Sequence, residues 1–454
     1  MARSTATHEG WPIKKFTRAF ASTAVAALAA SALVACGGGG DTEGPNVYFL
    51  NFKPEQDATY QAIAEEYTAE TGVPVKVVTA ASGNYEQTLR TEVGKSDAPT
   101  LFQMNGPTGF KTWKDYTADL SDFSLAQDLN EDVTPLTAED GTVRGIPFAV
   151  EGFGIIYNEE ITDKYFALPN PAVASMDEVK NFESLKKLAE DMQSKKDELG
   201  IDGTFASTSL TSGEDWRWQT HLANGPMHFE FEDLGTTDAE DVTFKYNKEF
   251  KNLFDLYLNN STIAPTLAPS KAVSDSMAEF ALGQAAFVQN GNWAWSQIAD
   301  VNGNVVKEDK IKFLPMYMGL PDEEKTGINV GTENYLAINA KAPEEDQQAT
   351  KDFLNWLFTS EAGKKHVIED LGFIAPFKNY TETDVPADPL ARQVQEAISN
   401  TELTTLPWDF QFFPSQQFKD DFGGNLAQYA SGNMEWADVV AKFSEDWKAE
   451  KGSN

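Results

Sequence analysis

Cysteine, histidine and basic residues are scarce in this chain of 454 residues, and each scarcity excludes a class of chemistry. A single cysteine, Cys36, leaves no partner for an intrachain disulfide. The net charge of −34 argues against nucleic acid as a partner, because binding of phosphates requires basic patches. No two of the four histidines have the spacing of metal ligands, so we predict no metal site; they are His8, His221, His228 and His366.

A glycine-rich phosphate-binding loop is also missing. The one notable glycine cluster, Gly37 to Gly40, precedes the first predicted strand, whereas a dinucleotide-binding fingerprint follows a strand. We therefore expect no cofactor. What remains is a long chain with 41% hydrophobic residues, enough for two or three domains with cores of their own.

The apolar run Ala19 to Leu33 is too short to span a bilayer comfortably and follows a basic stretch, so residues 1–35 are predicted to be an export signal. Small residues stand directly before Cys36, which resembles the bacterial lipobox, in which this thiol is acylated. We expect residues 36–45 to be a lipidated cysteine with a flexible tether, at the extracellular face of the cell membrane. The alternative is an ordinary signal peptide that happens to end near a cysteine.

From Val47 onward, strand-like and helical segments alternate. Short apolar runs at 47–50, 74–78 and 98–104 predict strands, and the periodic segments 60–71 and 84–92 predict helices. This alternation predicts an α/β fold with a parallel sheet that has helices on both faces. Ligands of such sheets bind at the carboxyl ends of the strands, where ordinary loop residues also occur. Four polar residues lie at those ends: Lys53, Ser82, Gln103 and Asn105.

Two segments are candidates for special roles in the fold. Gly145 to Pro147 and Gly154 to Asn158 both predict strands, and the link between them, which contains Glu151, is marked by proline and glycine. Such a link is a plausible crossing between two lobes. Further on, Gly331 to Asn334 predicts a turn before the strand Tyr335 to Ile338.

The stretch Ser276 to Ile298 combines a helix, a buried strand and a polar turn, Asn290-Gly291-Asn292, that leads to Trp293 and Trp295. This arrangement suits a cleft that presents an aromatic plate beside side-chain amides. Sugars need that pairing, because their C–H faces are flat and their hydroxyls are directional. The alternative is that both tryptophans belong to the core.

A second tryptophan-bearing segment spans Ser212 to Asn224. Capping by Ser212 or Asp215 predicts a helix with Trp216, Gln219 and Thr220 on one face, so that Trp216 lies in its first turn. Trp216 could reach into a cleft or pack in the core, and a packed histidine is the more ordinary interpretation of His221. Near the C-terminus, the proline-flanked aromatic segment Pro407 to Pro414 contains Asp409 and Phe410.

Taken together, these stretches resemble the solute-binding lipoproteins of bacterial ABC sugar importers, the maltose-binding-like group. The resemblance covers nearly the whole chain. Four motifs carry it in order: Gly145-Ile146-Pro147 with Gly154 to Asn158; Phe280-x-x-Gly283-x-Ala285-Ala286-Phe287 with Gly291-x-Trp293; Gly331-Thr332-x-x-Tyr335-x-x-Ile338; and Phe353-Leu354-x-Trp356-Leu357 with Ser360-x-x-Gly363. One departure is Thr332, where many members of the group have glycine, which changes the expected turn.

The resemblance implies a two-lobed, periplasmic-binding-protein-like fold of type II, with a mainly parallel sheet in each lobe and crossing hinge strands. The lobes would be 46–149 with 325–378, and 150–324 with 379–454. It implies a monomer without enzymatic activity that clamps an oligosaccharide and delivers it to the membrane permease. Trp293 would stack on a sugar face. The other implied ligand-binding residues are Asn292 and Asn334 for hydroxyls, Lys53, Asn105 and Asp409 for further polar contacts, and Glu151, Glu333, Trp216 and Phe410.

Two other functions stay open from the residues alone. Glu151, Glu333 and Asp409 supply candidate carboxylates for an extracellular glycosidase, which needs two that flank the scissile bond. The same fold could instead bind a solute that is not a sugar, such as a polyamine. Iron binders of this fold usually carry adjacent tyrosines, and the chain has none.

Overall fold

The computed structural model describes residues 44–81, 83–131, 133–381 and 383–451. The predicted export signal and Cys36 lie outside these residues. Residues 44–454 form one of two compact units, and every described residue belongs to that unit. Within the described part of the chain, no helix is both long enough and apolar enough to cross a membrane.

The first sheet contains the three strands that the alternation predicts near the N-terminus, and these three pair in parallel. β11 and β4 run against the other four strands. The strands, in spatial order, are β2 (Val75–Thr79), β1 (Val47–Asn51), β3 (Leu101–Asn105), β11 (Asn334–Ile338), β5 (Val143–Pro147) and β4 (Leu136–Thr137).

The second sheet is built around β6, which runs against the other five strands. In spatial order the strands are β12 (Thr404–Leu406), β10 (Thr326–Gly331), β6 (Glu151–Asn158), β8 (Ala285–Gly291) and β7 (Gly203–Phe205), and β9 (Ile311–Leu314) pairs with β6 beside β10. Most strands of each sheet thus share a direction, as predicted, although much of the pairing is antiparallel.

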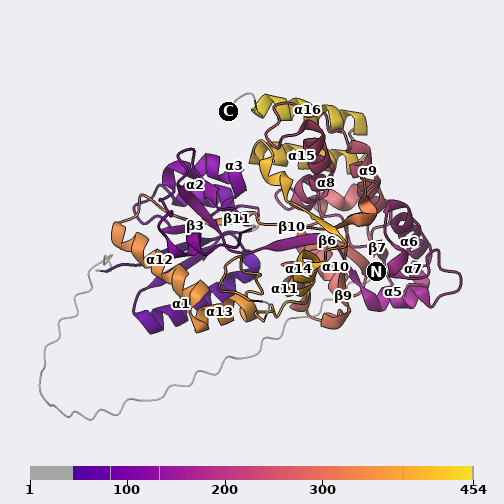
Figure 1. Ribbon diagram of the computed structural model, residues 1–454. Coiled ribbons are helices and arrows are strands. Elements are labelled where there is room, and N and C mark those ends of the chain that lie inside the picture. Colours follow the sequence, from indigo (N-terminus) through magenta and orange to yellow (C-terminus); the bar gives the residue numbers. More distant parts are fainter. Residues whose placement is uncertain (1–43, 82, 132, 382, 452–454) are drawn as a thin grey trace, which may run out of the picture. The chain divides into compact units, whose positions relative to one another are not determined.

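Neighbouring residues of a strand point to opposite faces of its sheet. Since consecutive residues of these strands are apolar, both faces of each sheet are apolar. In β1, Phe49 belongs to a core that contains side chains of α1 (Asp57–Thr71) and α12 (Glu344–Thr359). Its neighbour Leu50 belongs to the core under α2 (Tyr85–Glu92) and α3 (Gly106–Trp113). Figure 1 shows these four helices around the first sheet. Both faces are therefore covered, as an α/β fold requires.

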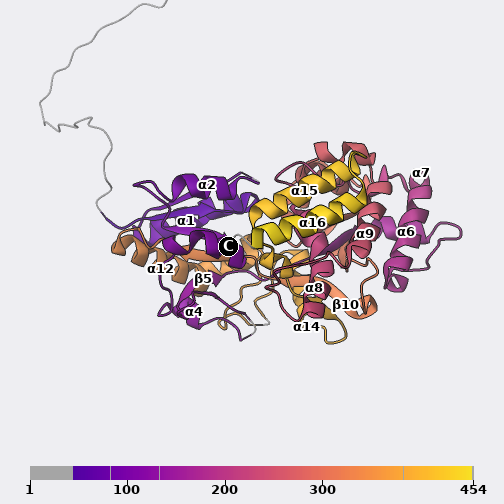
Figure 2. The same ribbon diagram turned by 90° about the horizontal axis from the view of Figure 1, so that it is seen from above.

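The same alternation organises the second sheet, where Ile155 and Ile156 of β6 enter different cores. Ile156 faces α10 (Val273–Ala281), α11 (Ala294–Ala299) and α14 (Pro389–Ser399). Ile155 faces the larger core. In that core α15 (Gln416–Ala430) and α16 (Trp436–Lys451) lie side by side (Figure 2). The other helices on this side are α5 (Glu159–Phe166), α6 (Phe182–Ser194), α7 (Lys196–Leu199), α8 (Ala223–Leu234) and α9 (Asn247–Asn259).

Two links carry the chain from one sheet to the other. Residues 148–150 join β5 of the first sheet to β6 of the second, so the predicted crossing is confirmed. Thr332 and Glu333 join β10 to β11 in the opposite direction, and the Thr332 hydroxyl donates a hydrogen bond to the Ala149 carbonyl. The two crossings are therefore tied to each other.

The pairing of β10 differs from the expected lobe boundary. The resemblance places residues from 325 onward in the first lobe, whereas β10 pairs with β6 and β12 in the second sheet. The sequence of an apolar strand does not indicate which sheet the strand joins. The second crossing begins only after β10, at Thr332. The lobe ranges as a whole remain a prediction.

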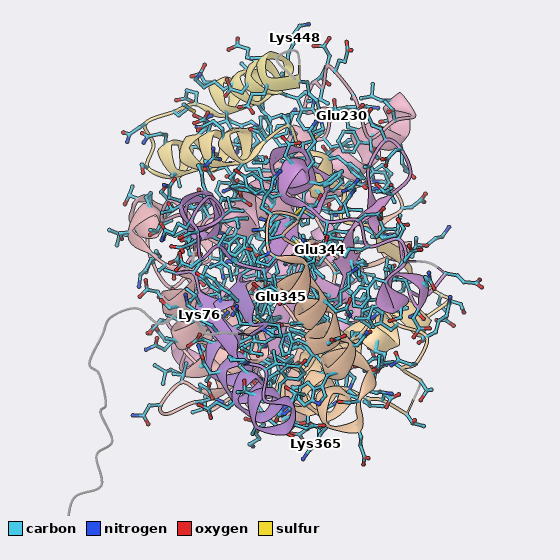
Figure 3. All side chains as sticks on the ribbon, turned by 90° about the vertical axis from the view of Figure 1, so that its left-hand side faces the viewer. Lys76, Glu230, Glu344, Glu345, Lys365 and Lys448 are labelled. Atoms are coloured by element: carbon cyan, nitrogen blue, oxygen red, sulfur yellow. The ribbon has the colours of Figure 1, made fainter. Side chains whose placement is uncertain are left out.

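Many charged side chains lie on the outside of the helices. Glu344 and Glu345 occupy the first turn of α12, where negative charge is favourable beside the helix dipole (Figure 3). Lys365, in α13 (Glu361–Lys365), and Lys448, in α16, are likewise exposed. These charged residues therefore lie on solvated helix faces, and no catalytic or binding role is needed to explain them.

Candidate functional site

The turn after β8 is fixed to the first crossing strand. Gly291 pairs with Phe153 of β6. The backbone N–H of Asn292 donates to the Gly152 carbonyl at 3.0 Å, and the Asn292 side-chain oxygen accepts from the Gly152 N–H at 2.9 Å. A Cβ at Gly291 would lie 2.1 Å from the Trp293 ring, so only glycine lets the indole rest on this backbone.

Trp293 lies among aromatic side chains of the second sheet and remains only partly buried. Its ring centroid is 6.0 Å from that of Trp216, 5.6 Å from that of His221 and 6.2 Å from that of Trp408. From the first sheet, the ammonium of Lys53 approaches to 5.8 Å of the ring centroid. The predicted pair of Trp293 and Trp216 therefore meets, and residues of both sheets surround it.

Lys53 follows β1 in a turn that Asn51 holds. The Asn51 side chain accepts from the Lys53 N–H at 3.0 Å and donates to the Lys53 carbonyl at 2.8 Å. The Lys53 Nζ lies 2.7 Å from the Glu151 Oε1 and 4.0 Å from the Glu55 Oε1. Because Glu151 opens β6, this buried ion pair joins the two sheets beside the crossing.

Burial and nearby charges together shift the pKa values of Lys53 and its neighbour Glu55. By itself, burial would lower the pKa of Lys53, but Glu151 and Glu55 outweigh it and the pKa is raised. Burial raises the pKa of Glu55, against the attraction of Lys53. Lys53 is therefore a firmly held cation.

The second crossing contributes Glu333 and Asn334. Asn334 is the register partner of Asn105 at the end of β3, and the Gly106 N–H donates to the Glu333 carbonyl at 2.8 Å. The pKa of the Glu333 carboxyl is raised, mainly by burial and also by the charge of Glu151. The charges of Lys419 and Lys53 act in the opposite direction. These electrostatic interactions place the predicted Glu333 near the Lys53–Glu151 pair.

Three buried amide atoms at this edge of the first sheet lack a hydrogen-bond partner among the described residues. They are the side-chain oxygens of Asn105 and Asn334 and the side-chain nitrogen of Gln103. A buried polar atom without a partner costs about 1–3 kcal/mol, so folded proteins rarely retain one without a reason. Such a cluster is suited to a bound polar solute.

Asp409 and Phe410 have partners inside the second core. The Asp409 Oδ2 lies 2.7 Å from the His228 Nδ1, so this carboxylate is engaged with α8. Phe410 is fully buried, with its ring centroid 5.4 Å from that of His221 and 6.2 Å from that of Phe153. Their role as ligand contacts remains a prediction.

The helix after Trp216 differs from the expected one. Residues Arg217–Leu222 form a π-helical stretch that continues into α8, so the α-helical spacing predicted for Trp216, Gln219 and Thr220 does not hold, although the Thr220 hydroxyl still donates to the Trp216 carbonyl. Wider turns of this kind occur often at functional sites, and no simple periodicity reveals them.

Two residues outside the predicted ligand-binding set lie close to the site: His221, which we expected to be packed, and Lys419, which the sequence analysis did not single out. His221 stacks on Phe153 at 4.1 Å, and burial, with the charges of Arg217 and Lys419, lowers its pKa well below 6.5, so it is neutral. Lys419 of α15 is buried, with its Nζ 5.7 Å from the Phe410 centroid; burial lowers its pKa, and Glu333 opposes this. A lone lysine in a helix has no local pattern that marks it.

A cavity of about 140 Å³ opens beside Trp293. The described residues contain no cluster of acids, histidines or cysteines that could hold a metal ion there or elsewhere. The cavity wall is formed by Glu151, Asn292, Trp293, Trp295 and Ser296 together with Gln56, Glu369–Phe373, Ala387 and Asp388.

Asp388 in this wall predicts a pH dependence of stability. Burial raises the pKa of its carboxyl to about 7, although the N–H groups of Leu390 and Ala391 favour the charged form. Between about pH 4 and 7 the folded protein thus retains a proton that the unfolded chain releases, and the free energy of unfolding falls as pH rises. Asparagine cannot titrate and caps helices equally well. The free energy of unfolding of Asp388→Asn should therefore rise relative to that of the unsubstituted protein when the pH is raised from 5 to 8.

Urea unfolding at both pH values measures this gain. The matched control is Asp140→Asn, because hydrogen bonds from Thr142 lower the pKa of that exposed carboxyl. It titrates below this range, so its difference from the unsubstituted protein should be equal at pH 5 and pH 8. An equal difference for Asp388→Asn as well would contradict the assignment.

Comparisons with solved structures concern the fold. The protein is similar to a chitin oligosaccharide binding protein, with 18% sequence identity and a TM-score of 0.70 over 91% of this chain and all of the other. It is also similar to a sugar transporter from Bacillus licheniformis in complex with stachyose, with 17% identity and a TM-score of 0.66 over 89% of this chain and all of the other. The GacH receptor of Streptomyces glaucescens, studied with acarbose, gives 16% identity and a TM-score of 0.66 over 90% and 99% of the two chains.

A family model provides the stronger evidence, because it matches the sequence itself. The model is described as bacterial extracellular solute-binding protein, and it matches residues 62–393, well over half of the chain. Two sheets joined by crossing strands, with polar and aromatic residues of both gathered at the crossings, are the arrangement that such a protein needs. The chain belongs to the family of bacterial extracellular solute-binding proteins.

Proposed function

We propose that this protein captures an oligosaccharide between its two sheets and delivers it to the permease of an ABC importer. One observation carries the proposal: Trp293, the buried Lys53–Glu151 pair and the unpartnered amides of Asn105 and Asn334 come from different sheets and gather at the crossings. An indole face suits the C–H face of a sugar ring, and amides and carboxylates suit its hydroxyls. The ligands of the three similar proteins, chitin oligosaccharide, stachyose and acarbose, support this class of solute.

Capture requires movement of one lobe against the other. The cavity of about 140 Å³ is smaller than the roughly 300–1,000 Å³ of pockets that hold whole small molecules. We propose that the lobes open about the two crossings, at residues 148–150 and 332–333, and that the solute favours the closed state because only that state lets both sheets contact it. The closed protein, which we expect to be a monomer, would then present both lobes to the permease.

We propose binding without chemistry. A glycosidase needs two carboxylates that are free to act on the scissile bond. Of the three candidates, Glu151 is paired with Lys53 and Asp409 with His228, which leaves Glu333 as the one without an ion pair among the described residues. Incubation with oligosaccharides should therefore release no new reducing ends, and their release would establish the glycosidase instead.

Isothermal titration tests the proposed solute. The purified protein would be titrated with α-galactosides, fructans, xylan and mannan fragments, chitin oligosaccharides and milk-type sugars, and with a polyamine as the non-sugar control. We expect micromolar or tighter binding of at least one sugar class and no heat from the polyamine. Heat from the polyamine with none from the sugars would leave the family assignment intact and refute the carbohydrate.

We also propose that the protein is anchored to the extracellular face of the cell membrane through acylated Cys36. The support is the sequence, in which an apolar segment and small residues lead to this single cysteine. Cys36→Ser removes the thiol that would be acylated, so the variant should move from the membrane fraction of expressing bacteria to the soluble or released fraction. Membrane association equal to that of the unsubstituted protein would contradict the anchor.

A further inference from the structure

We infer that Trp295 forms a second sugar-ring subsite in the cavity beside Trp293, so that the ligand has at least two units. The inference rests on the proposed carbohydrate function and extends it to the length of the solute. Trp293 and Trp295 both line the cavity, although only Trp293 belongs to the aromatic group around Trp216 and His221. Two tryptophans with different surroundings therefore border the same cavity.

Trp295 is anchored by the fold and still borders the cavity. It lies in α11, it is only partly buried, and it packs on the core that contains Leu390 of α14. Its indole N–H has no hydrogen-bond partner in the part of the chain that the structure describes. The side chain is thus supported by the fold, part of it remains accessible, and its N–H is unpaired among the described residues.

Another part of the cavity wall comes from the first sheet's core. Phe373 is buried there and also lines the cavity, and the Lys53 Nζ lies 6.0 Å from its ring centroid. The Gln56 side chain donates to the Leu371 carbonyl at 3.2 Å and fixes the loop that carries Phe373. The subsite therefore has contributions from both lobes, so closure would complete it as it completes the site at Trp293.

Two lining residues, Asp388 and Asn292, supply hydrogen-bonding atoms for hydroxyl groups. The Asp388 Oδ1 accepts from the N–H groups of Leu390 and Ala391 at 2.7 and 2.9 Å, whereas its Oδ2 has no partner among the described residues. The Asn292 side-chain oxygen is bound to Gly152, but its NH₂ group is likewise unpartnered there. One acceptor and two donor groups, the amide NH₂ and the indole N–H, match the mixed hydrogen bonding of a hydroxylated ring.

The charges favour a neutral ring over a cationic solute. Four carboxylates line the cavity, but Glu151 is paired with Lys53 at 2.7 Å and Asp370 with His366 at 2.6 Å. Glu369 lies on the surface, 3.9 Å from Lys365. Asp388 alone faces the cavity without a cation within ion-pair distance in the described structure. A polyamine would need several free carboxylates, which this wall does not supply.

Titration with oligosaccharides of one to four units tests the subsite. The probes are the maltose, chitin, xylan-derived and raffinose-type series, measured with the unsubstituted protein and with Trp295→Ala. We expect Trp295→Ala to weaken the longer members at least tenfold and to change the shortest member that binds by less than twofold. Trp295→Phe keeps a flat face and should restore part of the affinity, whereas Trp295→Leu keeps the contact with the Leu390 core and should not.

The controls separate this inference from the proposed function. Trp356, on the outer helix α12, is partly buried and lines no part of the cavity, so Trp356→Ala should leave every affinity unchanged. Trp293→Ala should weaken short and long members alike. If sugars bind but Trp295→Ala and Trp295→Leu have no effect, or an equal effect at every length, the second subsite is refuted and the function stands. If no sugar binds the unsubstituted protein, both proposals are refuted.

Discussion

Trp293→Ala is expected to weaken oligosaccharide binding at least tenfold. A sugar ring that covers about 60 Å² of one indole face contributes about 1.5 kcal/mol at about 25 cal/mol per Å². That free energy corresponds to about a tenfold change in Kd. Isothermal titration of the variant against the sugar that binds best measures the loss.

Gly291→Ala provides an independent route to the same loss. The added Cβ would come 2.1 Å from the Trp293 ring and would force the indole away from its place while leaving it in the chain. The affinity of Gly291→Ala for the sugar should fall, as that of Trp293→Ala does. The outer-helix control Trp356→Ala should bind the sugar as the unsubstituted protein does. Unchanged affinity in both site variants, with the fold intact by circular dichroism, would contradict a stacking role for Trp293.

Lys53→Met is expected to lower the free energy of unfolding by about 3–5 kcal/mol, because it leaves the buried Glu151 carboxylate without its cation. The two side chains are 6% and 4% exposed, and the ion pair joins the sheets. The double variant Lys53→Met with Glu151→Gln removes both charges and should recover a large part of the loss. Urea unfolding of the four proteins of this double-mutant cycle measures the coupling.

A surface ion pair provides the matched control. The Lys448 Nζ lies 2.8 Å from Asp241, with the two side chains 69% and 63% exposed, and Lys448 is labelled in Figure 3. Lys448→Met makes the same change in charge and volume, yet exposed pairs contribute only about 0–1 kcal/mol. If Lys53→Met cost no more than Lys448→Met, the crossing would not depend on the buried pair.

Local patterns in the sequence predicted several parts of the fold and site. The polar turn that leads to Trp293 could be identified because Asn290-Gly291-Asn292 is a strong turn signal after a short apolar strand. The link around Glu151 was identifiable because proline and glycine separate two β segments, and β5 and β6 indeed belong to different sheets. Lys53 was a candidate because it follows a predicted strand.

The features that could not be predicted depend on contacts between distant residues. Lys53 and Glu151 are 98 residues apart, and neither sequence context reveals the other. The approach of Lys419 to Glu333 and the partnership of Asp409 with His228 have the same origin. β10 could not be assigned to its sheet because apolar strands of both sheets look alike in sequence.

Hydrogen–deuterium exchange with and without the tightest-binding sugar tests most directly whether the solute binds between the two sheets. We predict slower exchange in three segments that come from both sheets and the second crossing: residues 51–53, 291–293 and 333–334. Exchange in the outer helices α6 and α12 should be unchanged. Sugar binding that left all three segments unchanged, or that protected only residues away from the crossings, would contradict capture between the lobes.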